Sequence, residues 1–261
     1  MLSGMSRTTA AAVGSLVLLG LLAAALGWRG RGGGARPLVV YAAAAVRVPL
    51  EAAARDYEAE HGRHVELRFG ASEDVLTRAG LVNPSDPADL FLPADDSYVR
   101  TARERGLVVE GFPLAAMRAV VLLAPGNPKG LAGWADLRRD GVRLAVPNPG
   151  AAVGKLTRDH LIAAGRWEAL KPHVADTGTV TEAANAAKVG AADAAVVWDA
   201  VAANYPGQTV LTPAELTGVV GRVEVAVLAQ SVDRAAALGF ARYLAHPEHG
   251  LKTFRAAGFT P

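Results

Sequence analysis

The sequence predicts an α/β protein with two lobes that are joined by two extended strands. Short apolar runs alternate with amphipathic helical segments from residue 38 onward, and this alternation is typical of parallel sheets covered by helices on both faces. The alternation occurs as two successive series of elements. Two long strand-like stretches, residues 118–124 and 222–229, are placed to carry the chain from the first lobe to the second and back.

The first series begins with a buried strand over residues 38–41, followed by a helix over 46–61 that ends at Gly62. Apolar side chains recur along this helix at helical spacing. Ser72 is expected to cap a helix whose first turn carries two acidic residues, as the helix dipole prefers. The other elements expected in this series are strands over 64–69, 88–92 and 118–124 and a helix over 97–105.

The second series repeats the alternation of strand and helix. A strand over residues 142–146 leads through a turn rich in proline and glycine into a helix over 153–164. The other expected elements are a short helix over 134–139, strands over 174–176, 194–198 and 222–229, and helices over 182–189, 234–245 and 247–257.

The first 36 residues are expected to lie outside the fold. Arg7 precedes an apolar run of about 18 residues, from Ala10 to Gly27, whose length suits either a cleaved secretion signal or a membrane anchor. Small residues at 23–27 offer cleavage points, whereas Trp28 and Arg29 suit the interfacial end of an anchor. Both alternatives predict a protein exported to the periplasm or another extracytoplasmic space.

Charge and cysteine content exclude several classes of function. The leader holds four arginines and no acidic residue, so without it Lys+Arg falls from 27 to 23 against 25 Asp+Glu. The formal net charge then changes from +2 to −2, and the basic pI gives no support to nucleic-acid binding. The absence of cysteine excludes disulfides, zinc–thiolate sites, thiol nucleophiles and lipid attachment to cysteine.

Catalytic and metal-binding signatures are missing from the sequence. It contains no nucleophile elbow, zincin motif, phosphate-binding loop or dinucleotide fingerprint. The histidine pairs 61/64 and 246/249 have a spacing that a metal could use, but no third ligand is placed to complete either site. We therefore expect no enzyme activity, no cofactor and no metal.

Three strand-to-helix turns consist almost entirely of small residues. They lie at residues 44–46, 70–72 and 150–154, the first two in the first lobe and the third in the second. In open parallel sheets, ligands bind beyond the carboxyl ends of the strands, where helix starts present free N–H groups and a partial positive charge. The pattern indicates a small anion held between the lobes, although an alanine-rich chain also places small residues at turns that bind nothing.

Several segments, taken together and in order, resemble a known family. These segments are YAAAAVRVPLEAAARDYEAEHG, VELRFGAS, PADLFLPADDSYV, VVLLAPGNP, VRLAVPNP, AAVVWDA and the final GFTP. The chain from residue 38 to 261 is similar to the periplasmic molybdate-binding proteins of ABC importers. The resemblance implies the type II periplasmic binding protein fold, with two α/β lobes, two crossover hinge strands and an oxyanion in the cleft. It implies a first lobe of residues 37–119 and 225–261 and a second lobe of residues 120–224.

The resemblance also implies a ligand set for the anion. The family's two first-lobe hydroxyls fall on Ala45 and Ser72, the second-lobe backbone donors fall on Val153 and Val180, and the aromatic hydroxyl falls on Trp198. Two of the three family hydroxyls are therefore absent. Ala45 retains only its backbone N–H, and Trp198 offers an indole N–H, which can donate but not accept.

Nearby charges leave the choice of ligand open. Glu73 and Asp74 would repel a dianion unless both face away, whereas Arg47 is placed to supply a compensating positive charge. The alternative to molybdate or a similar oxyanion is a different anion or a small organic acid in the same fold. The partners that the resemblance implies are the oxyanion and the membrane permease of an ABC transporter. We expect a monomer that binds no nucleic acid.

Overall fold

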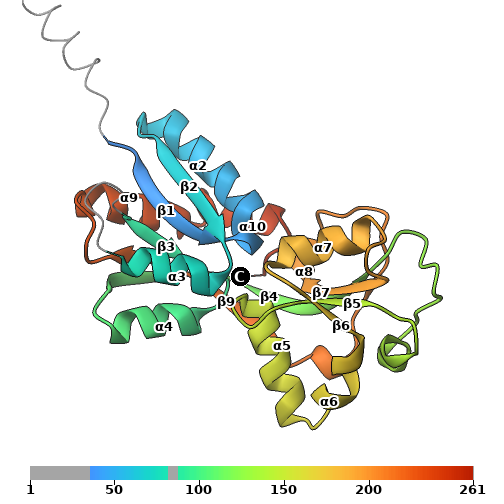
Figure 1. Cartoon of the computed structure of the whole chain (residues 1–261). Coiled ribbons are helices and arrows are strands. Elements are labelled where there is room, and N and C mark those ends of the chain that lie inside the picture. Colours follow the sequence, from blue (N-terminus) through green and yellow to red (C-terminus); the bar gives the residue numbers. More distant parts are fainter. Residues whose placement is uncertain (1–35, 82–87, 261) are drawn as a thin grey trace, which may run out of the picture. The chain divides into compact units, whose positions relative to one another are not determined.

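The computed structural model describes residues 36–81 and 88–260 (Figure 1). The expected leader over residues 1–36 lies, except for Arg36, outside the described residues. Within the described residues, no helix has the length and apolar character needed to cross a membrane. The unit that begins at Pro37 consists of two groups of α/β elements joined by two long strands.

The first group of elements is built on parallel strands. Strand β1 (Leu38–Ala43) pairs in parallel with β2 (Val65–Gly70) on one side and with β3 (Leu90–Leu92) on the other. All six residues of β1 are buried, as expected for a central strand covered on both faces. The helices that follow these strands are α2 (Arg47–His61), α3 (Ser72–Gly80) and α4 (Asp96–Glu104).

Two long antiparallel strands connect the two groups. Strand β4 (Val108–Leu123) pairs with β9 (Val220–Leu228) over most of their length. Strand β4 is about ten residues longer at its start than the predicted strand over 118–124. Gly111 and Pro113 suggest a strand end in the sequence, but the register shifts beside Pro113, which is how an edge or bulge position accommodates proline. The predicted lobe boundaries at 119/120 and 224/225 fall within these strands and stay a prediction.

The second group is also built on parallel strands. Strand β5 (Leu144–Pro147) pairs in parallel with β6 (Val174–Thr177) and β7 (Ala194–Trp198), and β7 pairs with β4 in the antiparallel sense. The short β8 (Val210–Leu211) also pairs with β4. The helices here are α5 (Ala152–Ala163), α6 (Trp167–Leu170), α7 (Val180–Lys188) and α8 (Asp199–Ala202). Single 3₁₀ turns cover Ala44–Val46, Trp134–Arg138, Lys171–His173 and Ala214–Leu216.

The C-terminal helices return to the first group of elements. Helix α9 (Arg234–Leu244) packs on β9, and α10 (Gly250–Ala256) packs on α2. Thr260 forms an isolated antiparallel bridge with Ala116 of β4, so the end of the described chain is tied to a crossover strand. The two-lobe α/β prediction, with two crossover strands, is therefore confirmed.

The motif PADLFLPAD supports the fold through two buried carboxylates. Asp89 is fully buried, accepts a hydrogen bond from the Val39 N–H at 2.9 Å and accepts another from the Ser231 hydroxyl at 2.7 Å. Asp95 accepts a hydrogen bond from the Ser97 N–H at 3.0 Å and so caps α4. Both carboxylates are satisfied by protein donors, which makes them structural residues.

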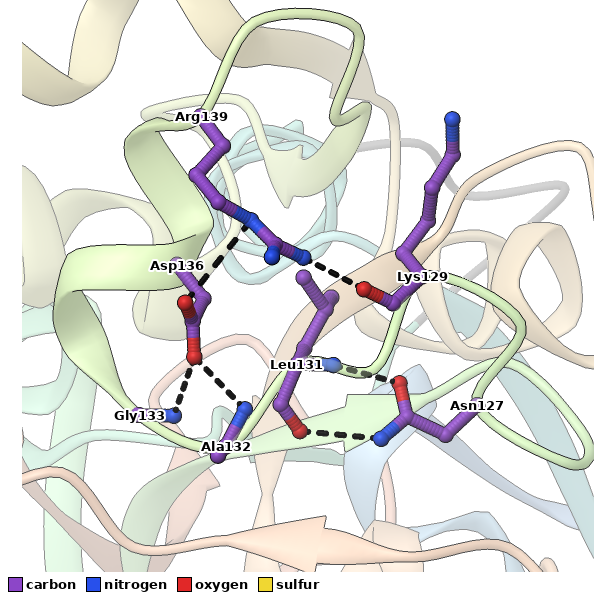
Figure 2. A network of polar contacts seen from close by, with 7 residues as sticks. All are labelled: Asn127, Lys129, Leu131, Ala132, Gly133, Asp136 and Arg139. Atoms are coloured by element: carbon purple, nitrogen blue, oxygen red, sulfur yellow. Dashed lines mark hydrogen bonds and ion pairs between the residues drawn. The ribbon is translucent and has the colours of Figure 1, made fainter.

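A polar network holds the loop that leads from β4 to β5 (Figure 2). Asn127 exchanges two side-chain hydrogen bonds with the backbone of Leu131, at 2.9 and 2.8 Å. Asp136 accepts hydrogen bonds from the N–H groups of Ala132 and Gly133, and these bonds lower the pKa of its carboxyl group. The network holds this long loop in one conformation.

Candidate functional site

A small pocket lies where the carboxyl ends of strands from both groups meet. Its volume is about 220 Å³, including space open to solvent. The lining residues are Ala43, Ala44, Ala45, Gly70, Ala71, Ser72, Ala94, Ala151, Ala152, Val153, Thr179, Val180 and Trp198. No Asp, Glu, Lys, Arg or His is among them, so polar groups here come from the backbone, two hydroxyls and one indole.

Helix starts from the first group form one side of this pocket. The 3₁₀ turn over Ala44–Val46 precedes α2, and the N-terminus of α3 follows β2 directly. Within the described parts of the chain, the N–H groups of Ala45 and Ser72 have no backbone acceptor. This is the normal condition of a helix start, and it leaves these donors available to an anion.

Ser72 has a different role in its helix from the predicted one. We expected Ser72 to be the helix cap, but Ala71 occupies that position and the Ser72 side chain makes no capping hydrogen bond. Its Oγ instead accepts the Ala94 N–H at 3.3 Å, and the residue is 1% exposed. Because an acceptor position of this oxygen is used by Ala94, its own O–H remains to be donated toward the pocket.

Two helix starts from the second group form the other side. Val153 lies in the first turn of α5, and Val180 is the first residue of α7. The turn before α5 is held by Asn148, whose Oδ1 accepts the Gly150 N–H at 3.0 Å. Among the residues the structure describes, no backbone acceptor is found for the N–H groups of Val153 and Val180. The first turn of each helix thus points free donors at the same space.

Thr179 is a lining residue that sequence reasoning missed. Its side chain caps α7 by accepting the Glu182 N–H at 3.2 Å, which leaves its O–H as a second hydroxyl donor at the pocket. The predicted helix began at residue 182, two residues too late. The pattern Thr179-x-x-Glu182 directly after a strand is the sequence signal of a capped helix start and could have identified it.

Trp198 lines the pocket and packs against both crossover strands. It is the last residue of β7, is 1% exposed and pairs with Ala119 of β4. A Cβ on Gly221 of β9 would lie 2.9 Å from the edge of the Trp198 ring and 2.7 Å from the Ala94 carbonyl oxygen. Glycine at this position is therefore what allows the indole to pack against β9.

The charged residues near the site lie outside the pocket lining. Arg47 is exposed, pairs with Glu51 at 3.2 Å and stacks over the ring of Phe69 at 3.9 Å. This placement differs from the expectation that Arg47 faces the anion, because the aromatic ring and the carboxylate hold its guanidinium elsewhere. Glu73 and Asp74 are also exposed and absent from the lining.

One backbone hydrogen bond crosses between the two sides of the pocket. The Glu73 N–H in α3 donates to the carbonyl oxygen of Gly150, in the turn before α5, at 2.9 Å.

Five of the six residues predicted from the resemblance line this one pocket. They are Ala45, Ser72, Val153, Val180 and Trp198. The sixth, Arg47, is not among the lining residues.

The sequence matches the family model for bacterial extracellular solute-binding proteins over residues 38–260. The chain belongs to the bacterial extracellular solute-binding protein family. The molybdate-binding protein ModA of Mycobacterium tuberculosis is 32% identical to it over 212 residues, which cover 79% of this chain and 78% of that protein.

Solved structures share the fold of this solute-binding protein. The periplasmic molybdate-binding protein of Azotobacter vinelandii matches with a TM-score of 0.71 at 23% identity, covering 86% of this chain and 99% of that one. The sulfate-binding protein SubI of M. tuberculosis matches with a TM-score of 0.73 at 22% identity, covering 87% of each chain. These neighbours are two-lobed binding proteins, and the fold prediction agrees with them.

Proposed function

We propose that this solute-binding protein binds a small tetrahedral oxyanion, molybdate or tungstate, and delivers it to the permease of an ABC importer. The observation that carries the proposal is a pocket ringed by helix starts and lined by no charged side chain. Fixed N–H dipoles in a dry site stabilise an anion without reorganising. A relative that is 32% identical and named for molybdate binding supports the same ligand class.

The donor set is sufficient for binding but leaves little excess. The N–H groups of Ala45, Ser72, Val153 and Val180, two hydroxyls and the Trp198 indole are the available donors. At about 1.5–3 kcal/mol for each hydrogen bond to a charged group, they contribute roughly 10–20 kcal/mol before costs. Association costs about 4–15 kcal/mol, and a micromolar Kd needs about 8 kcal/mol net. Most of the donors must therefore contact the anion.

A second candidate function keeps the fold and changes the ligand. Ala45 supplies no hydroxyl, and Trp198 places a large ring where the family resemblance implies a phenol. These two differences favour a different anion or a small organic acid as the alternative. Titration of the purified protein with molybdate, tungstate, sulfate, phosphate and simple carboxylates separates the candidates. A rise in melting temperature with a carboxylate alone would reject the oxyanion proposal.

The setting that we propose follows the family. The protein acts outside the cytoplasm, in the periplasm or at the outer face of the membrane, after export by its N-terminal segment. The partner is the membrane permease of the importer, and the protein acts as a monomer without nucleic acid. Mass analysis of the exported protein's N-terminus tests the leader: loss of the first 23–27 residues supports cleavage, and an intact Met1 or Met5 supports an anchor.

Phosphate is expected to bind more weakly than sulfate or molybdate. At pH 8 phosphate carries one O–H group, and no lining side chain is a carboxylate that could accept it. An unsatisfied buried donor costs about 1–3 kcal/mol, which corresponds to roughly tenfold to a hundredfold in Kd. Calorimetric titration at pH 8 measures this ratio. Equal affinity for phosphate and sulfate would show that an acceptor at the pocket receives the phosphate O–H.

Replacing Ser72 with alanine is expected to weaken oxyanion binding about tenfold or more. The substitution removes one hydroxyl donor to a charged ligand, worth about 1.5–3 kcal/mol. Ser97 provides the matched control, because its side chain lies on α4 away from the pocket lining. Ser97→Ala should retain the wild-type Kd. If both variants bind alike, the Ser72 hydroxyl does not contact the anion.

A further inference from the structure

A buried guanidinium lies behind the second-lobe side of the pocket. Arg158 belongs to α5, and its side chain is 10% exposed. Among the residues that the structure describes, Arg158 is the only buried basic residue. Taking a cation out of water is costly unless it is paired and hydrogen-bonded. The groups that bond to Arg158 therefore indicate what its burial contributes.

Arg158 bonds to both ends of the segment that joins the end of β5 to the first turn of α5. One guanidinium nitrogen, Nη1, donates to the carbonyl oxygen of Pro147, at the end of β5, and to that of Gly154 at 3.2 Å. The other, Nη2, donates to Asp176 Oδ1 on β6. The guanidinium also lies over the ring of Trp167, 4.9 Å from its centroid. All four contacts lie in the second group of elements.

The segment between the two bonded carbonyls contains one of the second-lobe donors of the pocket, the Val153 N–H. Ala151, Ala152 and Val153 line the pocket, and they follow the turn that begins at Pro147. Gly154 packs so closely on the Pro147 and Asn148 carbonyls that a Cβ would overlap them. Arg158 thus ties together the strand end and the helix start at a point where the two backbone segments leave no room for a Cβ.

The charge of Arg158 is only partly balanced where it lies. The Asp176 side chain is 67% exposed, whereas that of Arg158 is 10% exposed, so solvent screens the carboxylate more than the guanidinium. The guanidinium therefore places a positive charge beside the first turn of α5, where its Nη1 bonds the Gly154 carbonyl oxygen. It has the same sign as the partial charge that the helix presents there.

We propose that Arg158 is a positioning residue for the anion site, and this inference rests on the proposed function. It fixes the Pro147–Gly154 segment so that the free N–H group of Val153 faces the ligand. Its positive charge adds to the electrostatic attraction for the anion. Because the guanidinium lies behind the pocket, it does not bind the anion directly. A residue that served only to stabilise the second lobe would have no effect on ligand affinity.

Arg143 provides a matched control for this role. It lies next to the opposite end of β5 and makes the same kinds of contact, with the Gly190 carbonyl oxygen at 3.0 Å and with the Asp193 carboxylate. It is not among the pocket-lining residues. Arg143→Met and Arg158→Met each remove an arginine that bonds a carbonyl oxygen and a carboxylate. Only Arg158→Met removes bonds to the Pro147–Gly154 segment, which lies at the pocket.

The test compares wild type, R158M, R158K and R143M by calorimetric titration with molybdate, tungstate and sulfate. R158M should raise the Kd about tenfold to a hundredfold, the range found when partners that orient metal ligands are removed. R158K keeps the positive charge but loses the planar guanidinium, which donates to several acceptors at once. Its Kd should therefore lie between those of wild type and R158M. R143M should bind as wild type does, whatever it does to the melting temperature.

Hydrogen exchange on the ligand-free proteins provides a readout that does not depend on the ligand. The N–H groups of Gly150, Ala151 and Lys155 are hydrogen-bonded, and R158M should speed their exchange while R143M leaves it unchanged. Equal Kd values for R158M and R143M, or unchanged exchange in this segment, would overturn the positioning role alone. A wild-type protein that binds none of the three anions would instead refute the proposed function.

Discussion

Replacing Gly154 with alanine is expected to raise the Kd for the oxyanion about a hundredfold and to destabilise the protein. A Cβ at this position would overlap the carbonyl oxygens of Pro147 and Asn148. Both are backbone atoms, so neither can rotate away as a flexible side chain could. Overpacking of this kind typically costs about 1–3 kcal/mol, and relief requires the whole turn to move away from the pocket.

The measurements are calorimetric titration with molybdate and the thermal unfolding midpoint. Gly133→Ala is the control, because Gly133 has extended backbone and no atom within 4 Å of where its Cβ would lie. That substitution should change stability by no more than about 0.5 kcal/mol and leave the Kd unchanged. A wild-type Kd in Gly154→Ala would show that the turn before α5 does not contribute to binding.

Replacing Asp89 with alanine is expected to lower the free energy of unfolding by about 3–5 kcal/mol. The fully buried carboxylate accepts hydrogen bonds from Val39 on β1 and Ser231 after β9, and the backbone of Asp89 also bonds to Val39 and Leu228. Each hydrogen bond to a charged group is worth about 1.5–3 kcal/mol, and a buried N–H left unpaired adds to the loss.

Urea unfolding measures this change directly. Asp140→Ala is the control, since Asp140 is exposed and should change stability by no more than about 0.5 kcal/mol. Because Asp89 lies outside the pocket lining, folded Asp89→Ala should retain the oxyanion Kd within a factor of about two. A stable variant that has lost binding would mean that this carboxylate acts at the ligand site.

Much of the fold could be predicted from the sequence because its strands and helices are separated by clear turn signals. Apolar runs such as residues 194–198 and helices that end at glycine, as α2 does at Gly62, allow few alternatives. Strand β4 was predicted too short because Gly111 and Pro113 normally end a strand. Its long pairing with β9, which overrides that local signal, is not visible in one sequence.

The site was partly predictable for a similar reason. Helix starts after parallel strands meet at one edge of a sheet, so residues 44–46, 70–72 and 150–154 could be expected to converge. The direction of a long side chain is not set by such a pattern. Arg47 lies over Phe69 and not at the pocket because this ring, from the next strand, and the carboxylate of Glu51, one turn along the same helix, bind its guanidinium. Thr179 was missed because its helix was predicted to begin two residues late.

A crystal structure with tungstate tests the central claim most directly, since tungsten is located unambiguously by its anomalous scattering. We expect one tungsten peak in the pocket, with oxygens about 2.7–3.2 Å from the backbone nitrogens of Ala45, Ser72, Val153 and Val180. Tungsten bound elsewhere on the protein, or a pocket left without it at saturating tungstate, would contradict the account.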